Sequence, residues 1–163
     1  MNWELAGILA EVISATAVIV TLVFLAFELR SNRRATQSAA VEAAATGFNT
    51  MNTTIISDPE FAEIFVRSQA GDESITPIDL FRCQMLMQSY INHYTTLKKY
   101  HDNGILPDVD WRGYSVAMAA LTNSPGGETI CQRIEISDSV RAELAKVRGQ
   151  ETPYSLSKSK EGR

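Results

Sequence analysis

Residues 6–27 read AGILAEVISATAVIVTLVFLAF, and this run of 22 residues contains one charged side chain, Glu11. As an α-helix that rises about 1.5 Å per residue, the run is about 33 Å long, which matches a membrane hydrocarbon core of about 30 Å. The rest of the 163-residue chain has the mixed composition of a globular protein. Residues 6–27 therefore predict a transmembrane helix.

Two other interpretations of this run are less consistent with its flanks. A cleaved signal peptide has a basic segment before the apolar run and a small-residue cleavage site after it. Here the run is preceded by MNWEL and continues into ELR, which provides neither feature. A buried helix of a water-soluble protein seldom stays apolar on every face over this length.

Basic residues on one side of the run predict its orientation. No Lys or Arg precedes it, whereas Arg30, Arg33 and Arg34 follow it. The positive-inside rule then places residues 1–5 outside as a short extracytoplasmic N-terminus, and everything after Arg30 in the cytoplasm. Trp3 fits an outer interfacial anchor, and the three arginines fit an anionic inner leaflet.

Small side chains recur along the predicted span at intervals of three and four residues. A repeat of 3.5 residues allows two helices to approach closely in lipid as a left-handed pair, and Ala6, Ala10 and Ser14 also provide the small-xxx-small spacing of a right-handed pair. The alternative is that Ala and Gly are simply common in any membrane span. The candidate helix–helix interface consists of Gly7, Ala10, Glu11, Ser14, Ala17 and Thr21.

Glu11 borders this small-residue face. A charged carboxylate inside a bilayer costs about a few kcal/mol unless it is protonated, paired or hydrated. One interpretation is that Glu11 contributes to an oligomer interface or lines a polar conduit. The other is that it reaches the interface, so that the apolar segment begins at Val12.

Cap motifs divide the remaining chain into helices. Residues 28–57 are predicted as a juxtamembrane helix that can continue the span, since no Pro or Gly separates the two. Asp58-Pro59 and Thr76-Pro77 each combine an N-cap residue with proline at the first helical position. The first of these helices should bury Phe61, Ile64 and Phe65 and end near Gly71.

The helix predicted over residues 77–103 has the most regular apolar pattern, and Gly104 fits its C′ position. Its stripe repeats at intervals of three and four residues, as expected of a bundle helix. The members of the stripe are Leu80, Cys83, Met87, Tyr90, Tyr94, Leu97 and His101.

Three shorter helices should follow, over residues 108–122, 125–134 and 138–148, the last two capped by Ser124 and Ser137. Residues 150–163 are polar and are predicted to be disordered. No segment shows the alternation of a β-strand. We therefore expect an all-α protein with one transmembrane helix and a small cytosolic helical bundle over residues 58–149.

Charge and cysteine content narrow the functional classes. The formal net charge is −4, and residues 58–151 hold 14 acidic against 9 basic residues, which argues against a nucleic-acid partner. Two cysteines, Cys83 and Cys131, are too few for a disulfide scaffold, and a cytoplasmic location predicts free thiols.

No catalytic, cofactor-binding or metal-binding pattern is found, so none is predicted. His93 and His101 are eight residues apart, which does not place them on one helix face as a metal pair would be. His101-Asp102, near a helix end, is more simply a cation favoured by the helix dipole. Tyr90, His93 and Tyr94 form the densest polar-aromatic group and are a candidate pocket or partner surface, the alternative being the edge of the core.

The segments EVISA at residues 11–15 and LAFELRSN at residues 25–32 resemble an uncharacterised family of small bacterial single-span membrane proteins. Those proteins have a GE(I/V)(I/V)GA start, an LAxQ(I/V)RxN exit and a cytosolic helical domain. The later DPE at 58–60 and SPGG at 124–127 also resemble their recurring elements. This chain departs from the pattern at Ser14 and Glu28. The resemblance implies a bacterial inner-membrane location and no particular activity.

These observations favour a membrane-anchored interaction or assembly protein, either self-associating or bound to another membrane protein, with membrane lipid as its surroundings. A second hypothesis is a homo-oligomeric pore with Glu11 facing the lumen. A third is a membrane-tethered enzyme with an unrecognised site around Tyr90, His93 and Tyr94.

Overall fold

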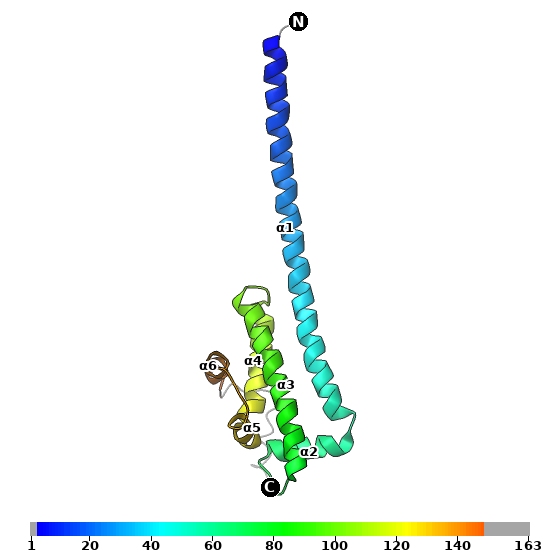
Figure 1. The fold of residues 1–163 in the computed structure, drawn as a ribbon, viewed down its shortest axis with the longest axis vertical. Coiled ribbons are helices and arrows are strands. Elements are labelled where there is room, and N and C mark those ends of the chain that lie inside the picture. Colours follow the sequence, from blue (N-terminus) through cyan, green and yellow to red (C-terminus); the bar gives the residue numbers. More distant parts are fainter. Residues whose placement is uncertain (1–2, 149–163) are drawn as a thin grey trace. The chain divides into compact units, whose positions relative to one another are not determined.

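The computed structural model describes residues 3–148, with residues 5 and 6 described by their backbone only. Within this range the chain is all-helical and contains no strand, which confirms the all-α prediction (Figure 1). The predicted disordered tail, residues 150–163, lies outside the described residues, as do residues 1–2. The helices are α1 (Trp3–Ile56), α2 (Pro59–Gln69), α3 (Pro77–Asp102), α4 (Asp108–Thr122), α5 (Pro125–Cys131) and α6 (Asp138–Lys146).

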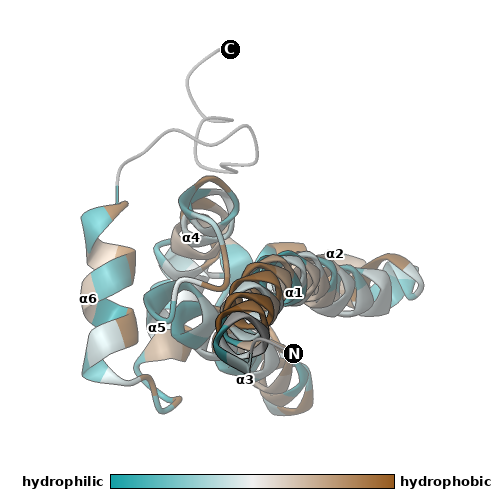
Figure 2. Cartoon of the chain, turned by 90° about the horizontal axis from the view of Figure 1, so that it is seen from above, coloured by the Kyte–Doolittle hydropathy of each residue, from teal (hydrophilic) through white to brown (hydrophobic). Residues whose placement is uncertain are grey.

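The chain divides into two compact units, residues 1–39 and residues 40–163, here called the N-terminal and the C-terminal unit. The N-terminal unit consists of the first part of α1, which runs through Ser31-Asn32 without a break. Its most apolar window contains no buried residue, and α1 is long and apolar enough to cross a membrane by length and composition. Figure 2 shows these apolar turns in brown, whereas α6 is mostly teal and white.

Three helices of the C-terminal unit begin at the cap motifs that the sequence predicts. The Asp58 carboxylate accepts the Phe61 N–H of α2 at 3.0 Å. The Thr76 hydroxyl accepts the Asp79 N–H of α3 at 3.3 Å, and the Ser124 hydroxyl accepts the Gly127 N–H of α5 at 2.9 Å. Proline follows each cap, where its missing N–H costs nothing.

Two glycines end helices as predicted. After α2, Gly71 has φ +81°, and after α3, Gly104 has φ +66°. Both values lie in the left-handed region, where a residue with a Cβ is disfavoured. The chain can therefore reverse direction directly after each of these helices.

The last two helices are shorter than predicted. α5 ends at Cys131 rather than near residue 134, because Ile134 and Ile136 both pack against the core. Alternate residues can face the same side only in an extended segment, not in a helix. α6 ends at Lys146, and its N-cap residue Ser137 makes no side-chain cap bond, since its hydroxyl lies 3.3 Å from the Ser139 hydroxyl.

The buried face of α3 follows the predicted stripe and is wider than predicted. Its central members are buried, while Leu80 and His101 at its two ends are only half-buried. Leu86 and Ile91, which lie beside the stripe, are also buried. α3 contacts helices on more than one side, namely α2, α4 and the part of α1 that belongs to the C-terminal unit. An apolar stripe that faces a single partner helix is too narrow to make contacts with all of these helices.

α5 begins in direct contact with the end of α2. A Cβ at Gly126 would lie 1.6 Å from the Ser68 carbonyl oxygen, so only glycine allows this approach. The Ser124 hydroxyl also lies 2.7 Å from the Gln69 amide oxygen. The SPGG segment is therefore a close backbone junction between two helices.

Candidate functional site

The predicted helix–helix interface lies on the exposed surface of the N-terminal unit. Gly7, Ala10, Ser14, Ala17 and Thr21 are all exposed on α1. The Ser14 hydroxyl donates to the Ala10 carbonyl at 2.7 Å, and the Thr21 hydroxyl to the Ala17 carbonyl at 2.8 Å. These hydroxyls are satisfied within their own helix, so this face offers close packing rather than polar bonds to a partner.

The other residues singled out on α1 are also exposed. Glu11 lies on the surface of the N-terminal unit, and Trp3 at its start is 76% exposed. Arg30, Arg33 and Arg34 are exposed as a cluster directly after the apolar turns. The predicted anchors therefore have the side-chain freedom that interfacial residues need.

Tyr90, His93 and Tyr94 do not form an exposed surface; they lie at the core, which is the alternative that the sequence had left open for this group. Tyr90 and Tyr94 are 2% and 0% exposed, and His93 is half-buried. The three side chains instead hold α3 against its neighbours. Sequence spacing alone could not separate these possibilities, because the edge of a core and a pocket wall use the same residue types.

His93 fits into a notch on α1, within the C-terminal unit. Its Nε2 lies 3.1 Å from the Ala44 carbonyl oxygen, which can only accept, so this nitrogen donates. The ring occupies the space beside Gly47, where a Cβ would lie 2.2 Å from the His93 Cε1. Phe48 packs edge-on against the imidazole with 5.1 Å between centroids. The sequence analysis missed Gly47 and Phe48, and a glycine inside an alanine-rich helix was the available signal.

The hydroxyl groups of the buried tyrosines are anchored by hydrogen bonds to neighbouring helices. The Tyr90 hydroxyl donates to the Asn52 amide oxygen at 2.6 Å, and the Tyr94 hydroxyl to the Ser115 hydroxyl at 2.9 Å. Burial raises the pKa of both phenols to about 12. Each hydroxyl therefore stays protonated at neutral pH and serves as a fixed hydrogen-bond donor.

Both cysteines are free, buried and poorly suited to nucleophilic chemistry. Burial raises the pKa of the Cys83 thiol and of the Cys131 thiol. The thiolate, which is the reactive form, is thus disfavoured at neutral pH. Cys83 lies inside the α3 stripe and packs there as a small apolar side chain.

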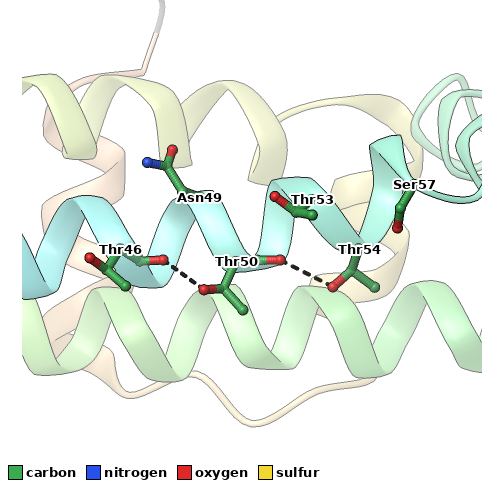
Figure 3. A pocket seen from close by; sticks show the side chains of 6 residues that line it. All are labelled: Thr46, Asn49, Thr50, Thr53, Thr54 and Ser57. Carbon is green, nitrogen blue, oxygen red and sulfur yellow. Dashed lines mark hydrogen bonds between the residues drawn. The ribbon is translucent and has the colours of Figure 1, made fainter.

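An uncharged polar surface covers the exposed side of α1 in the C-terminal unit (Figure 3). The Thr50 hydroxyl donates to the Thr46 carbonyl at 2.8 Å, and the Thr54 hydroxyl to the Thr50 carbonyl at 3.1 Å. These two hydroxyl groups therefore donate within α1, as the hydroxyls of Ser14 and Thr21 do. The surface forms a shallow, open depression lined by Thr46, Asn49, Thr50, Thr53, Thr54 and Ser57.

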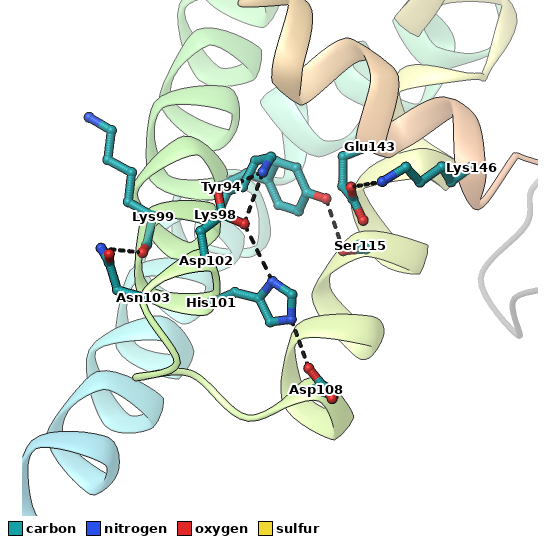
Figure 4. Close-up of polar contacts among 10 residues, drawn as sticks. All are labelled: Tyr94, Lys98, Lys99, His101, Asp102, Asn103, Asp108, Ser115, Glu143 and Lys146. Atoms are coloured by element: carbon teal, nitrogen blue, oxygen red, sulfur yellow. Dashed lines mark hydrogen bonds and ion pairs between the residues drawn. The ribbon is translucent and has the colours of Figure 1, made fainter. Parts of the chain in front are cut away.

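A cluster that the sequence analysis treated only as a helix-end cation joins α3, α4 and α6 (Figure 4). His101 stacks on Trp111 of α4, with 5.0 Å between ring centroids and 14° between planes. On α6, Lys146 donates to Glu143 at 2.8 Å, and this hydrogen bond chiefly holds the Glu143 pKa below its ordinary value, to which Trp111 adds a smaller effect. The buried indole of α4 therefore packs against the end of α3.

Among residues 3–148, no group of three or more His, Cys, Asp or Glu side chains is placed to hold a metal ion. Comparison of the chain with protein-family models, with curated proteins and with solved structures gave no match.

Proposed function

We propose that this chain is a membrane-anchored helical assembly protein, with α1 as anchor and self-association surface and the C-terminal unit in the cytoplasm. The observation that carries the proposal is the exposure of large apolar side chains on every side of α1 between Ile8 and Leu29. Examples are Ile19, Phe24 and Phe27, which are 61%, 69% and 67% exposed.

Such a surface is costly in water. Burying one Val, Leu, Ile or Phe side chain contributes about 1.5–3 kcal/mol, and this segment contains many of them. The C-terminal unit, in contrast, buries the apolar stripe of α3 within its own core. A hydrocarbon environment satisfies the α1 side chains, and the three arginines that follow support the cytoplasmic orientation.

A carbonate wash of membranes from expressing cells tests the anchor. We expect the full-length protein to remain in the membrane fraction. The double variant Val18→Arg/Leu22→Arg should be released, because each arginine near the centre of a span costs about 2.5–3.5 kcal/mol. Ile78→Arg is the matched control, since Ile78 on α3 is also exposed, at 72%. Release of the unmodified protein would overturn the anchor.

Protease added outside intact spheroplasts tests the orientation. We expect the C-terminal unit to be protected until the spheroplasts are lysed, as the arginine cluster at residues 30–34 predicts. Digestion before lysis would show the opposite orientation, while leaving the anchor itself in place.

The assembly part of the proposal rests on the small-residue face. The spacing of 3 and 4 residues that joins Gly7 to Thr21 recurs from Ala43 through Thr46, Thr50 and Thr53 to Ser57, on residues that are also exposed. In the first segment, small side chains with internally satisfied hydroxyls let two backbones approach closely.

Light scattering coupled to size exclusion in mild detergent tests the assembly. We expect a defined oligomer that dissociates in Ser14→Leu/Ala17→Leu, because two large side chains then separate the backbones. Ala15→Leu/Thr16→Leu adds comparable bulk on the opposite side of the helix and should leave the mass unchanged. A monomer before any substitution would overturn self-association and leave the anchor to be judged by the carbonate wash.

A further inference from the structure

Two neighbouring helices of the C-terminal unit each contain a long segment without charge. Residues 43–57, at the end of α1, and residues 83–97 of α3 contain no Asp, Glu, Lys or Arg. In contrast, residues 58–82 contain eight charged residues and residues 98–148 contain fourteen. Depletion of charged residues is a feature of the cores of protein–protein interfaces.

The two uncharged segments contact each other through hydrogen bonds and aromatic packing, so that α1 runs along α3 (Figure 3). α4 packs against one side of this pair, where Phe48 of α1 stacks on Tyr114 and Tyr94 of α3 bonds to a serine. Thr50 lies two positions after Phe48, which is about 200° around the helix axis. Asn92 lies two positions before Tyr94, by the same rotation. Thr50 and Asn92 therefore face away from α4.

The side of the pair that faces away from α4 is exposed on both helices. Its central residues, here called the uncharged face, are Thr46, Thr50 and Thr54 of α1 with Ser89, Asn92 and Thr96 of α3. Four of its hydroxyls, those of Thr50, Thr54, Ser89 and Thr96, donate to carbonyls of their own helix at 2.8–3.2 Å. Burying donors that are already bonded costs less than burying free ones. Phe81 and Met85, which precede Ser89 by two turns and one turn, are 56% and 46% exposed and add apolar area.

The charge of the C-terminal unit indicates which partner this face suits. Residues 58–151 hold 14 acidic against 9 basic residues, so two copies of the unit repel each other where their charged surfaces meet. In a two-fold dimer the same patch of both copies meets, so a charged residue near the axis faces a like charge. A face without charge avoids this cost, whereas a basic partner would be attracted to the acidic surfaces elsewhere. The occupant that the uncharged face fits is therefore a second copy of the chain.

The size of the face indicates a contact between copies that are already held together. Fifteen helical residues are about 22 Å long, and two helices packed about 10 Å apart present a width of about 20 Å. The projected area of about 450 Å² falls short of the roughly 800 Å² that each partner contributes to a stable interface of standard size. A shared tether raises the effective concentration of the two copies to about the millimolar range, at which a weak contact forms.

We propose that the uncharged face is a second self-association surface, on which the same face of a second copy packs about a two-fold axis. This inference rests on the proposed self-association and extends it from the apolar part of α1 to the C-terminal unit. The two helix pairs then pack against each other as four helices, with uncharged polar side chains between them.

Cysteine cross-linking in membranes from expressing cells tests the face. Thr50→Cys in the full-length chain is treated with a short bifunctional maleimide, and Thr129→Cys, at an exposed position of α5 outside the face, is the matched control. The unmodified chain gives the background from the buried Cys83 and Cys131. We expect a covalent product with the mass of two copies, several-fold more abundant in Thr50→Cys than in the control. Equal yields, or a product that contains a different protein, would overturn the proposal.

Charge exchange tests whether the face meets its own copy. With Thr46→Cys as the cross-linking position, Thr50→Asp/Asn92→Asp in every copy should lower the dimer yield several-fold, because like charges then face each other. Co-expression of this variant with Thr50→Lys/Asn92→Lys should restore the yield, because opposite charges then meet. Thr129→Asp adds a charge outside the face and should leave the yield unchanged. A yield that does not recover on co-expression contradicts the two-fold contact.

Light scattering of the unmodified chain separates this inference from the proposed function. If the chain is an oligomer but Thr50→Cys cross-links no better than Thr129→Cys, the uncharged face is not a contact, and association through the apolar part of α1 still stands. A monomer in the same measurement would overturn both.

Discussion

The first half of α1 and the central part of α3 both carry many apolar side chains, and they place these side chains differently. Between Ile8 and Leu29, the large apolar side chains of α1 are more than half exposed. On α3, the side chains from Cys83 to Leu97 that repeat every three or four residues are almost fully buried. This part of α1 exposes apolar side chains on all sides, whereas α3 buries a patterned set of them against neighbouring helices.

The difference follows from what each helix packs against. A stripe can be covered by neighbouring helices of the same chain, as α2, α4 and part of α1 cover α3. A helix that is apolar all round needs an apolar medium or further partners. The apolar content of a helix alone thus says little about what the helix packs against. The periodicity of its apolar residues distinguishes a bundle helix from a proposed membrane anchor.

The largest effect should come from truncating one aromatic side chain on each helix. Tyr94→Ala should lower the free energy of unfolding of the C-terminal unit by about 3–5 kcal/mol, because it removes the stack on Trp111 and leaves Ser115 without its partner. Phe24→Ala, at an exposed position of α1, should change it by less than about 0.5 kcal/mol. Urea unfolding of the full-length protein in detergent measures both, and equal losses would contradict the comparison.

The next effect concerns glycine. Gly126→Ala should cost about 1–3 kcal/mol, since its Cβ would collide with the Ser68 carbonyl and separate α5 from α2. Gly113→Ala, in open space on α4, should instead stabilise the unit by about 0.5–1 kcal/mol. Gly7→Ala, which is equally open on α1, should leave this unfolding transition unchanged. A loss in Gly113→Ala matching that of Gly126→Ala would refute the close junction.

A smaller effect is expected at the helix caps. Ser124→Ala should cost about 1 kcal/mol, because the Gly127 N–H loses its acceptor. Ser137→Ala should cost clearly less, because that hydroxyl makes no cap bond. The difference between the two urea midpoints measures the contacts of the Ser124 hydroxyl, namely its cap bond and its hydrogen bond to Gln69.

The smallest effect is an acid dependence of the C-terminal unit. The Ser74 hydroxyl and N–H, followed by Arg67, lower the pKa of Asp72 to about 2 from an ordinary value of 3.8. A depressed pKa means that this stabilisation is complete above the ordinary value and is lost as the pH falls toward about 2. Asp72→Asn should therefore flatten the decline of the urea midpoint between about pH 4 and pH 2. An identical decline would show that the Asp72 contacts do not contribute.

Local signals in the sequence predicted much of the fold. The starts of α2, α3 and α5 depend on an N-cap residue and the proline after it, which are read from neighbouring positions. Helix ends were less accurate, because Ile134 and Ile136 leave the helix to reach a core formed by other segments. The burial of Leu86 and Ile91 similarly depends on which helices surround α3.

The candidate sites were harder to predict, for the same reason. Tyr90 and Tyr94 were expected either at a surface or at the edge of the core, and only the arrangement of α1, α3 and α4 shows that they are buried. The Trp111 stack joins residues of α3 and α4, and no local sequence pattern predicts it. The small-residue face of α1 was read directly from spacing, and its role in assembly remains a proposal.

The notch in which Gly47 receives the His93 ring also constrains how the sequence can vary over evolutionary time. With no room for a Cβ at position 47, a larger residue there requires a smaller one at position 93. Each single step passes through a variant that is either overpacked or missing its bond to Ala44. Positions 47 and 93 should therefore change as a pair among sequences that share this fold, although 46 positions separate them along the chain.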